Sequence, residues 1–219
     1  MLPYPRADER KAMVEYQIAA RGIRDPRILA AMEEIPRHLF IPPPYDRAAY
    51  DDNPVPIGNG QTISQPYIVA VMTALLSPKV ADNMLEIGSG SGYQAAVLSR
   101  LVRKLTTIER IKTVADLAKR NLKTIGIDNV VVIEGDGTLG YPDNAPYDGI
   151  IITAATPDVP EPLIEQLADG GTLVAPVGGR DLQDLVTIHK QGQSFTRMSH
   201  GGVRFVPLIG QHGWENENS

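Results

Sequence analysis

The sequence predicts an α/β fold in which a mostly parallel, doubly wound sheet is flanked by N-terminal helices and closed by C-terminal strands. Two observations support this prediction. Short apolar segments of strand length alternate with longer segments of helical periodicity through the middle of the chain, as βαβ units do. Glycine and acidic residues follow several of these strands, at the sheet edge where open α/β folds bind ligands.

The N-terminal segment is expected to form helices that cover the sheet. Residues from about Ala7 to Arg21 place apolar side chains on one helical face, and Gly22 predicts the end of that helix. Asp25-Pro26 predicts an N-cap followed by proline at the first helical position. The proline-rich segment Arg37 to Pro56 then predicts a long irregular loop, either functional and mobile or simply a surface linker.

A further helix is expected from Pro66, after a turn marked by Gly58 and Gly60. Ser64 or Gln65 is the predicted N-cap of this helix. Ser64 has a second interpretation, because a hydroxyl at a helix N-terminus is well placed to meet a carboxylate.

The segment NMLEIGSGSG, Asn83 to Gly92, predicts a buried strand followed by a glycine-rich turn. Helical spacing resumes from Tyr93 to Val102. Strand, glycine turn and helix together are typical of the nucleotide-binding unit of a Rossmann-like sheet, where backbone N–H groups approach a ligand closely. A tight turn without a ligand has the same pattern, so both interpretations stay open at this point.

Acidic residues follow the next two predicted strands. Lys104 to Glu109 is the second strand, and Glu109 lies about 20 residues beyond the glycine turn, where such sheets hold ribose hydroxyls. A solvated residue at a strand end is the alternative. Asp136 follows the third strand, Val130 to Ile133. It either forms a turn or accepts a hydrogen bond from an adenine amine.

The rest of the chain is expected to complete one domain of 219 residues. Residues 1–60 are assigned to the N-terminal helices and a substrate-side loop, 61–210 to the cofactor-binding core, and 211–219 to a polar tail that is expected to be frayed from Gly213 onward. The remaining predicted elements are a helix from Val114 to Ile125, a strand from Tyr147 to Thr153, a helix from Pro160 to Leu167, a strand from Thr172 to Val177, and closing strands from Leu182 to Lys190 and from Phe195 to Leu208 around Gly192.

Composition excludes several classes of protein. A net charge of −5 argues against a general nucleic-acid binder, which needs a basic face. With zero cysteines there is no disulfide, thiolate zinc site or cysteine nucleophile. The N-terminus lacks an apolar signal region and no run approaches membrane-spanning length. We therefore expect a soluble cytoplasmic protein without nucleic-acid or membrane partners.

The sequence is poor in groups that carry out chemistry themselves. It has no phosphate-binding GxxxxGK[ST] motif, no nucleophile elbow, and four scattered histidines without metal-ligand spacing, so no metal is expected. A site without its own bases, nucleophiles or metals suits a reaction in which the cofactor carries the reactive group, as S-adenosylmethionine does. A nicotinamide dehydrogenase is an alternative, although GSGSG departs from GxGxxG and no hydride-relay acid is evident.

Six stretches together resemble the protein-L-isoaspartate O-methyltransferase family. The resemblance extends from about Arg37 to Leu208, and its most specific part is GxGQTISQP, which a small-molecule methyltransferase or a noncatalytic adaptor would not need. The stretches are IGNGQTISQPYIVAVMT, LEIGSGSGYQAAVLS, TTIERIKTVADLAKRNL, EGDG, YDGIIITAA and GGTLVAPVG.

The resemblance implies a repair reaction on isoaspartate-containing proteins and peptides. S-adenosylmethionine donates a methyl group to the free α-carboxylate of L-isoaspartate, and the ester cyclises to a succinimide that returns in part to aspartate. It also implies that Ser64 is the active-site serine. We expect the loop from Arg37 to Gly60 and the segment Arg204 to Leu208, with Val206 and Pro207, to hold the peptide or simply to cover the sheet edge.

The resemblance further implies a set of cofactor contacts. Gly88 and Gly90 would line the methionine portion, Glu109 would hold the ribose, and Asp136 and Gly137 would meet the adenine. The full set is Ile63, Ser64, Gln65, Gly88, Gly90, Glu109, Asp136 and Gly137.

Overall fold

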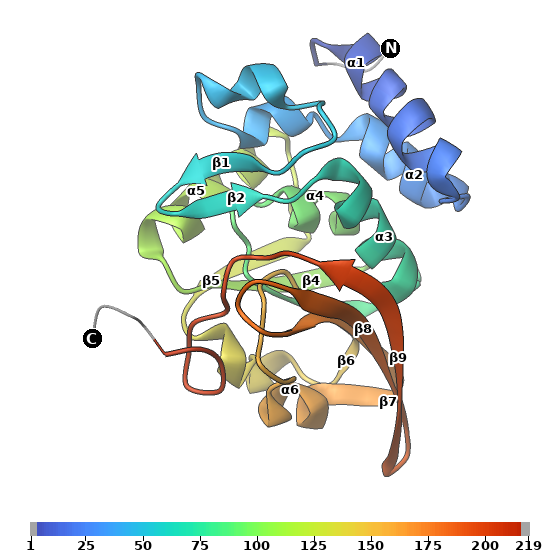
Figure 1. The fold of residues 1–219 in the computed structure, drawn as a ribbon, viewed down its shortest axis with the longest axis vertical. Helices are drawn as coiled ribbons and strands as arrows, with labels where there is room; N and C mark the ends of the chain where they lie inside the picture. The colour runs from blue at the N-terminus through green and yellow to red at the C-terminus, as the bar shows by residue number, and fades with distance from the viewer. Residues whose placement is uncertain (1–3, 216–219) are drawn as a thin grey trace.

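A seven-stranded sheet forms the centre of the computed structural model, which describes residues 4–215 (Figure 1). Its spatial order is β5-β4-β3-β6-β7-β8-β9. The strands from β5 to β7 run parallel, whereas β8 and β9 are antiparallel to their neighbours. Their bounds are β3 (Asn83–Ile87), β4 (Lys104–Glu109), β5 (Val130–Glu134), β6 (Tyr147–Ile152), β7 (Leu167–Gly178), β8 (Gln183–Gln191) and β9 (Ser194–Val203).

Strand order reverses at β3, and this reversal positions the site. The chain first adds strands on one side of β3, as β4 and β5, and then crosses to the other side to form β6 and β7. In open α/β sheets, ligands bind at the carboxyl ends of the strands beside such a reversal. The predicted doubly wound, mostly parallel sheet is confirmed.

Two apolar cores lie on opposite faces of the sheet, as alternation along β3 requires. Leu85 and Ile87 face the core that includes α6 (Glu161–Gln166). Met84 faces the other core, to which α3 (Pro66–Leu76), α4 (Tyr93–Ser99) and α5 (Lys112–Thr124) contribute. Each fully buried aliphatic side chain of this kind stabilises the fold by about 1.5–3 kcal/mol. By the same alternation Glu86 lies on the Met84 face.

The N-terminal helices form as expected, but they pack beside α3 rather than directly on the sheet. α1 (Ala7–Ala12) continues through a π-helical segment and a 3₁₀ turn until Gly22, whose φ of 102° ends the helix. α2 (Pro26–Glu34) begins at the predicted N-cap, where the Asp25 side chain accepts a hydrogen bond of 2.9 Å from the Arg27 backbone N–H.

The segment from Arg37 to Pro56 is more ordered than the expected irregular loop. It contains two 3₁₀ turns, and the fully buried Arg37 donates from Nε to the Ala49 carbonyl at 2.7 Å. A hairpin of β1 (Val55–Gly58) and β2 (Gln61–Ile63) follows. The turn at Gly58 and Gly60 was predicted, but its flanking strands were not, because three or four residues carry too little pattern.

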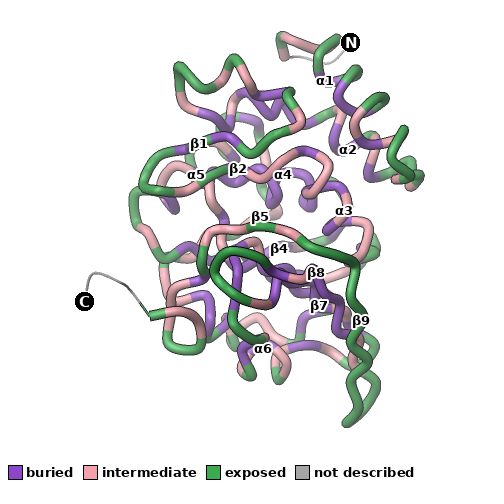
Figure 2. Tube along the Cα trace, viewed as in Figure 1, coloured by how far each residue is buried: buried purple, intermediate pink, exposed green. Residues whose placement is uncertain are grey.

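The C-terminal part starts as the predicted hairpin around Gly192 and then turns back across the sheet edge. β9 is exposed along almost its whole length (Figure 2). The strand predicted to continue to Leu208 ends at Val203, because residues 206–208 pair instead with Ala155: the Ala155 N–H donates to Val206 and the Leu208 N–H donates to Ala155, both at 2.7 Å.

Residues 211–215 are hydrogen-bonded to the rest of the fold although three of them are exposed, so the expected fraying from Gly213 is not seen in this part of the tail. The Trp214 N–H donates to the Leu208 carbonyl at 2.8 Å, and the Gln211 N–H donates to Asp136. The remainder of the predicted tail, residues 216–219, lies outside the described residues. None of the helices in residues 4–215 is long and apolar enough to span a bilayer.

Candidate active site

The glycine turn after β3 has a backbone that only glycine adopts readily. Gly88, Gly90 and Gly92 have φ values of 92°, 51° and 92°, in the left-handed region. A methyl group on Gly88 would lie 2.6 Å from Thr153 Oγ1, closer than van der Waals contact allows. The Thr153 hydroxyl donates to the Ile87 carbonyl at 2.9 Å, so the turn is held close to the end of β6.

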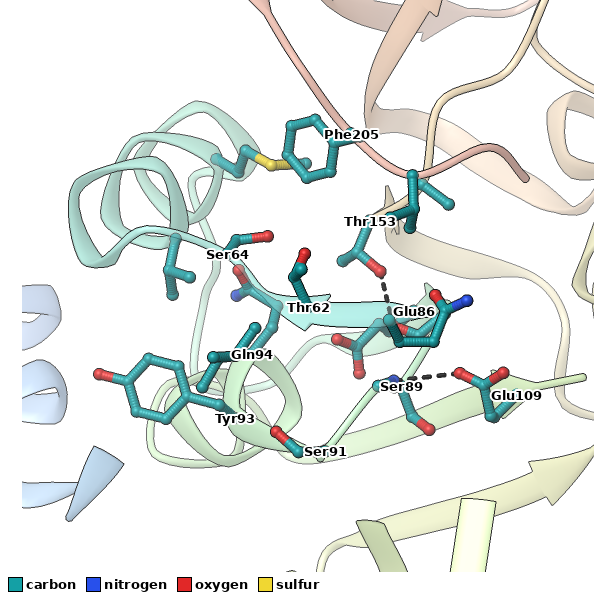
Figure 3. A pocket seen from close by; sticks show the side chains of 18 residues that line it. Thr62, Ser64, Glu86, Ser89, Ser91, Tyr93, Gln94, Glu109, Thr153 and Phe205 are labelled. Carbon is teal, nitrogen blue, oxygen red and sulfur yellow. Dashed lines mark hydrogen bonds between the residues drawn. The ribbon is translucent and has the colours of Figure 1, made fainter. Parts of the chain in front are cut away.

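Glu109 links this turn to the start of α5. One of its carboxylate oxygens accepts a hydrogen bond from the Gly90 N–H at 3.1 Å (Figure 3). The other accepts from the Ile111 N–H at 3.0 Å. The residue is only 8% exposed, yet it lines two cavities at the sheet edge. A carboxylate with lone pairs left beside a cavity can accept hydrogen bonds from ligand hydroxyls.

Glu86 is a functional candidate that the motif comparison missed. It is 0% exposed, lines the cavity beside the glycine turn, and neither carboxylate oxygen has a hydrogen-bond partner among the described residues. Burial is the main cause that raises the pKa of its carboxyl to about 8; the nearby Thr107 hydroxyl opposes this rise, and the negative charge of Glu109 adds to it. A buried carboxylate without a partner is costly, which points to a cationic partner supplied from outside the chain. The available signal was a charge inside an otherwise apolar strand.

The cavity beside the glycine turn brings together most of the predicted cofactor residues (Figure 3). Its volume is about 60 Å³. Among the predicted residues, those lining it are Ile63, Ser64, Gly88, Gly90, Glu109 and Val206.

A second cavity of about 60 Å³ continues along the sheet edge on the other side of Gly88. Glu109 lines it as well, together with Gly137 and Pro207. Its walls combine the apolar Ile108, Ile111, Leu208 and Ile209 with the polar Gln61, Glu109 and Arg110, so it offers an apolar slot with polar edges. A flat heteroaromatic ring with one polar edge suits such a slot.

Asp136 lies outside the linings of these two cavities. Its carboxylate accepts from the Thr138 N–H at 2.9 Å and from the Gln211 N–H at 2.8 Å. Burial opposes ionisation, but the hydrogen bonds from Gln211 and Thr138 outweigh it and lower the pKa of Asp136. The structure thus places Asp136 as an anchor for the C-terminal segment, and its expected adenine contact stays a prediction.

A groove of about 580 Å³ opens beside the first cavity. Gln65 lines this groove rather than the cavity. The two spaces share one boundary, at which Figure 3 shows three hydroxyl side chains and an aromatic ring around the same volume. The residues lining both spaces are Thr62, Ser64, Thr153, Phe205 and Val206.

The sequence predicts Ser64 or Gln65 as the N-cap of α3, and the structure has Gln65 at that position. Neither residue makes a side-chain capping bond. Because Pro66 already occupies the first helical position, Ser64 lies one residue before the cap and points to the boundary between cavity and groove. Its hydroxyl is therefore available to a ligand.

The donor set fits S-adenosylmethionine. Left-handed glycines leave room for the methionine portion, Glu109 suits ribose hydroxyls, the apolar slot suits adenine, and the unpaired Glu86 carboxylate suits a cation. Within residues 4–215, no group of three or more His, Asp or Glu side chains is arranged to hold a metal ion.

The parallel sheet with its glycine turn, acidic strand end and adjoining groove defines an S-adenosylmethionine-dependent methyltransferase. The family model for protein-L-isoaspartate(D-aspartate) O-methyltransferase matches residues 8–213. The chain therefore belongs to that family, which confirms the resemblance inferred from its motifs and the methyltransferase activity on isoaspartyl residues that it implies.

Curated relatives match almost end to end. The protein-L-isoaspartate O-methyltransferase of Methanoregula boonei is 65% identical over 214 residues, covering 98% of this chain and 99% of the relative. That of Methanospirillum hungatei is 60% identical over 212 residues, covering 97% and 98%.

Solved structures agree with the fold. A protein-L-isoaspartate O-methyltransferase superposes with a TM-score of 0.83 at 29% identity, covering 93% of this chain and 67% of that one. The Plasmodium falciparum protein solved in complex with S-adenosyl-L-homocysteine has a TM-score of 0.80 at 25% identity, covering 91% and 98%.

Proposed function

We propose that this chain binds S-adenosylmethionine between the glycine turn and Ser64, and methylates the free α-carboxylate of L-isoaspartyl residues in damaged proteins and peptides. The observation that carries the proposal is the boundary shared by the cofactor cavity and the open groove, because a donor on one side and an acceptor on the other meet there. The groove is large and open enough for a peptide, as a protein substrate requires.

The reaction needs alignment more than acid–base catalysis. One oxygen of the substrate carboxylate forms a bond to the methyl carbon while the carbon–sulfur bond breaks, and its electron pair goes to sulfur. A carboxyl with an ordinary pKa near 4 is already ionised at pH 7, so no proton has to be removed. The next backbone amide nitrogen then loses its proton and attacks the ester carbonyl, and methanol leaves to give a succinimide. Addition of water to the succinimide returns part of the material to aspartate.

Ser64 is the proposed catalytic residue. Its hydroxyl lies at the shared boundary and donates to the incoming carboxylate, with the Thr62 hydroxyl on the neighbouring strand end beside it. These donors replace part of the water around the carboxylate and hold it behind the methyl group. Val206, in the segment that pairs with Ala155, forms the opposite wall for the peptide. Pro207, which was also predicted to hold the peptide, lines the second cavity instead.

The cofactor is held by residues on the other side of the boundary. Glu109 accepts from the ribose hydroxyls while it keeps its bonds to the Gly90 and Ile111 N–H groups. Glu86 receives a cationic group of the methionine portion, and Gly137 borders the adenine. The bound sulfonium supplies an activated methyl group, which is the one reactive group that the chain lacks.

A matched pair of peptides tests the proposal. The protein is incubated with methyl-labelled S-adenosylmethionine and two peptides that differ only in aspartate versus L-isoaspartate. Base-labile label is expected in the isoaspartyl peptide alone. Equal labelling of both peptides, or none, would overturn the proposed substrate.

Three expectations from the sequence stay predictions: cytoplasmic location, absence of nucleic-acid and membrane partners, and independence from metals. The last is checked by repeating the assay after dialysis against a chelator, where full activity is expected.

A further inference from the structure

The groove beside the cofactor cavity carries one unpaired positive charge. Among the described residues that line it, Arg204 is the only charged one, and it is exposed. No hydrogen bond, ion pair or ring contact joins it to another residue in the described part of the chain. Asp184, which pairs with the adjacent Gly202 across the sheet, instead accepts from the Ser199 hydroxyl at 2.8 Å.

Arg204 is set back from the reacting atoms. The next two residues, Phe205 and Val206, line both the cofactor cavity and the groove, whereas Arg204 lines the groove alone. The carboxylate that receives the methyl group has to lie at the shared boundary, beside Ser64. Arg204 therefore faces the parts of the peptide that flank the isoaspartyl residue.

The other walls of the groove are mostly apolar. Leu182 is 61% exposed there, and Pro54, Ile68 and Val203 surround the same space. Such walls accept many side chains without strong preference, so a single charge has the largest influence on which flanking residue is favoured. The chain as a whole has a net charge of −5, which repels acidic peptides elsewhere on the surface.

We propose that Arg204 is a specificity-determining residue that favours substrates with a second carboxylate close to the isoaspartyl residue. This inference rests on the proposed function. The second carboxylate belongs either to an aspartate or glutamate side chain or to a free peptide C-terminus, since both present the same group to a guanidinium. A solvent-exposed pair of this kind corresponds to about a two- to fivefold effect on kcat/KM.

The test uses a set of short isoaspartyl peptides with glutamate or glutamine at each flanking position in turn, and with a free or amidated C-terminus. Wild-type protein is expected to prefer the carboxylate-bearing member at one position by about two- to fivefold in kcat/KM at low salt. The preference is expected to shrink in 1 M salt, where the Debye length is about 3 Å. Comparing the side-chain and C-terminal pairs identifies which carboxylate is recognised.

Three variants at this position assign the preference to Arg204. Arg204→Gln is expected to abolish the discrimination, Arg204→Lys to keep part of it, and Arg204→Glu to reverse it in favour of the member without the second carboxylate. Arg197→Gln is the matched control, because Arg197 is an exposed arginine on β9 that lies outside the groove, 3.7 Å from Asp158. This control is expected to discriminate as the wild type does.

Three outcomes would overturn the role of Arg204. They are equal rates with all flanking residues in the wild type, discrimination that survives in Arg204→Gln, and an equal loss of rate with every peptide in that variant. The last result would place Arg204 on the reacting carboxylate or in the fold. Failure of the wild type to methylate any isoaspartyl peptide would instead refute the proposed function itself.

Discussion

Replacing Glu86 by glutamine is expected to stabilise the protein without cofactor, by an amount that grows with pH. The carboxyl ionises near pH 4.5 in the unfolded chain, but burial raises its pKa to about 8 in the folded protein. Between these values the folded state holds a proton that the unfolded state has released. The contribution of Glu86 to stability is therefore fully present below pH 4.5 and is lost as the pH rises to 8.

The magnitude follows from the two pKa values. Each pH unit within the window costs the wild type about 1.4 kcal/mol relative to the glutamine variant, which does not titrate. The difference in unfolding free energy is therefore expected to be near zero at pH 4.5, about 3 kcal/mol at pH 7, and at most about 5 kcal/mol above pH 8.

Urea unfolding of both proteins at one-unit intervals from pH 5 to pH 9 measures this difference. Comparing two proteins at each pH removes the titration of every other group. A difference that stays constant over this range would refute the reasoning, because Glu86 would then ionise alike in both states.

The same variant is expected to bind cofactor more weakly. A cation beside Glu86 stabilises its ionised form, so saturating S-adenosylhomocysteine should flatten the pH dependence of wild-type stability but not that of Glu86→Gln. An equal dissociation constant in the two proteins at pH 8 would remove Glu86 from the cofactor site.

Three further predictions concern the rest of the site. Ser64→Ala is expected to lower kcat about 10- to 100-fold, as for a lost hydrogen bond to a charged group, with cofactor affinity within about twofold; steady-state kinetics with cofactor titration decides, and unchanged kcat removes Ser64 from the mechanism. Glu109→Gln should weaken cofactor binding and lower the melting temperature, since the Gly90 and Ile111 N–H groups lose a charged acceptor. If this variant bound the cofactor as tightly as the wild type does, the assignment of Glu109 to the ribose would be contradicted. Gly88→Ala should abolish cofactor binding, as measured by calorimetry, because the backbone φ of 92° strains an alanine and the added methyl group would contact Thr153. If the variant bound the cofactor as tightly as the wild type does, the cofactor would not approach the backbone closely at Gly88.

Much of the fold was predictable because its central elements carry strong local patterns. Strand β4 has the bounds expected from its apolar pattern, and α2 begins at the cap that Asp25-Pro26 indicated. The glycine turn was predictable for the same reason, although the glycines alone did not separate a ligand-binding turn from a tight turn without a ligand. These features are determined by residues close together in the sequence, so the local sequence is enough to predict them.

Other features depend on contacts between distant segments. The hydrogen bond from the Gln211 N–H to the Asp136 carboxylate joins residues 75 positions apart, and no local sequence pattern predicts it. The pairing of Ala155 with residues 206–208 ends β9 early for the same kind of reason. The unpaired state of Glu86 becomes visible only when the helices above the sheet are in place. Ser64 was predicted as a site residue through its motif, whereas the local pattern did not decide between Ser64 and Gln65 as the helix cap, which is Gln65.

The most direct test of the account is a crystal structure with S-adenosylhomocysteine and an isoaspartyl peptide bound together. The account predicts that the sulfur lies in the cavity beside the glycine turn and faces the free α-carboxylate across the boundary formed by Thr62, Ser64 and Thr153. A sulfur directed away from the groove, or a peptide bound at another face of the sheet, would contradict it.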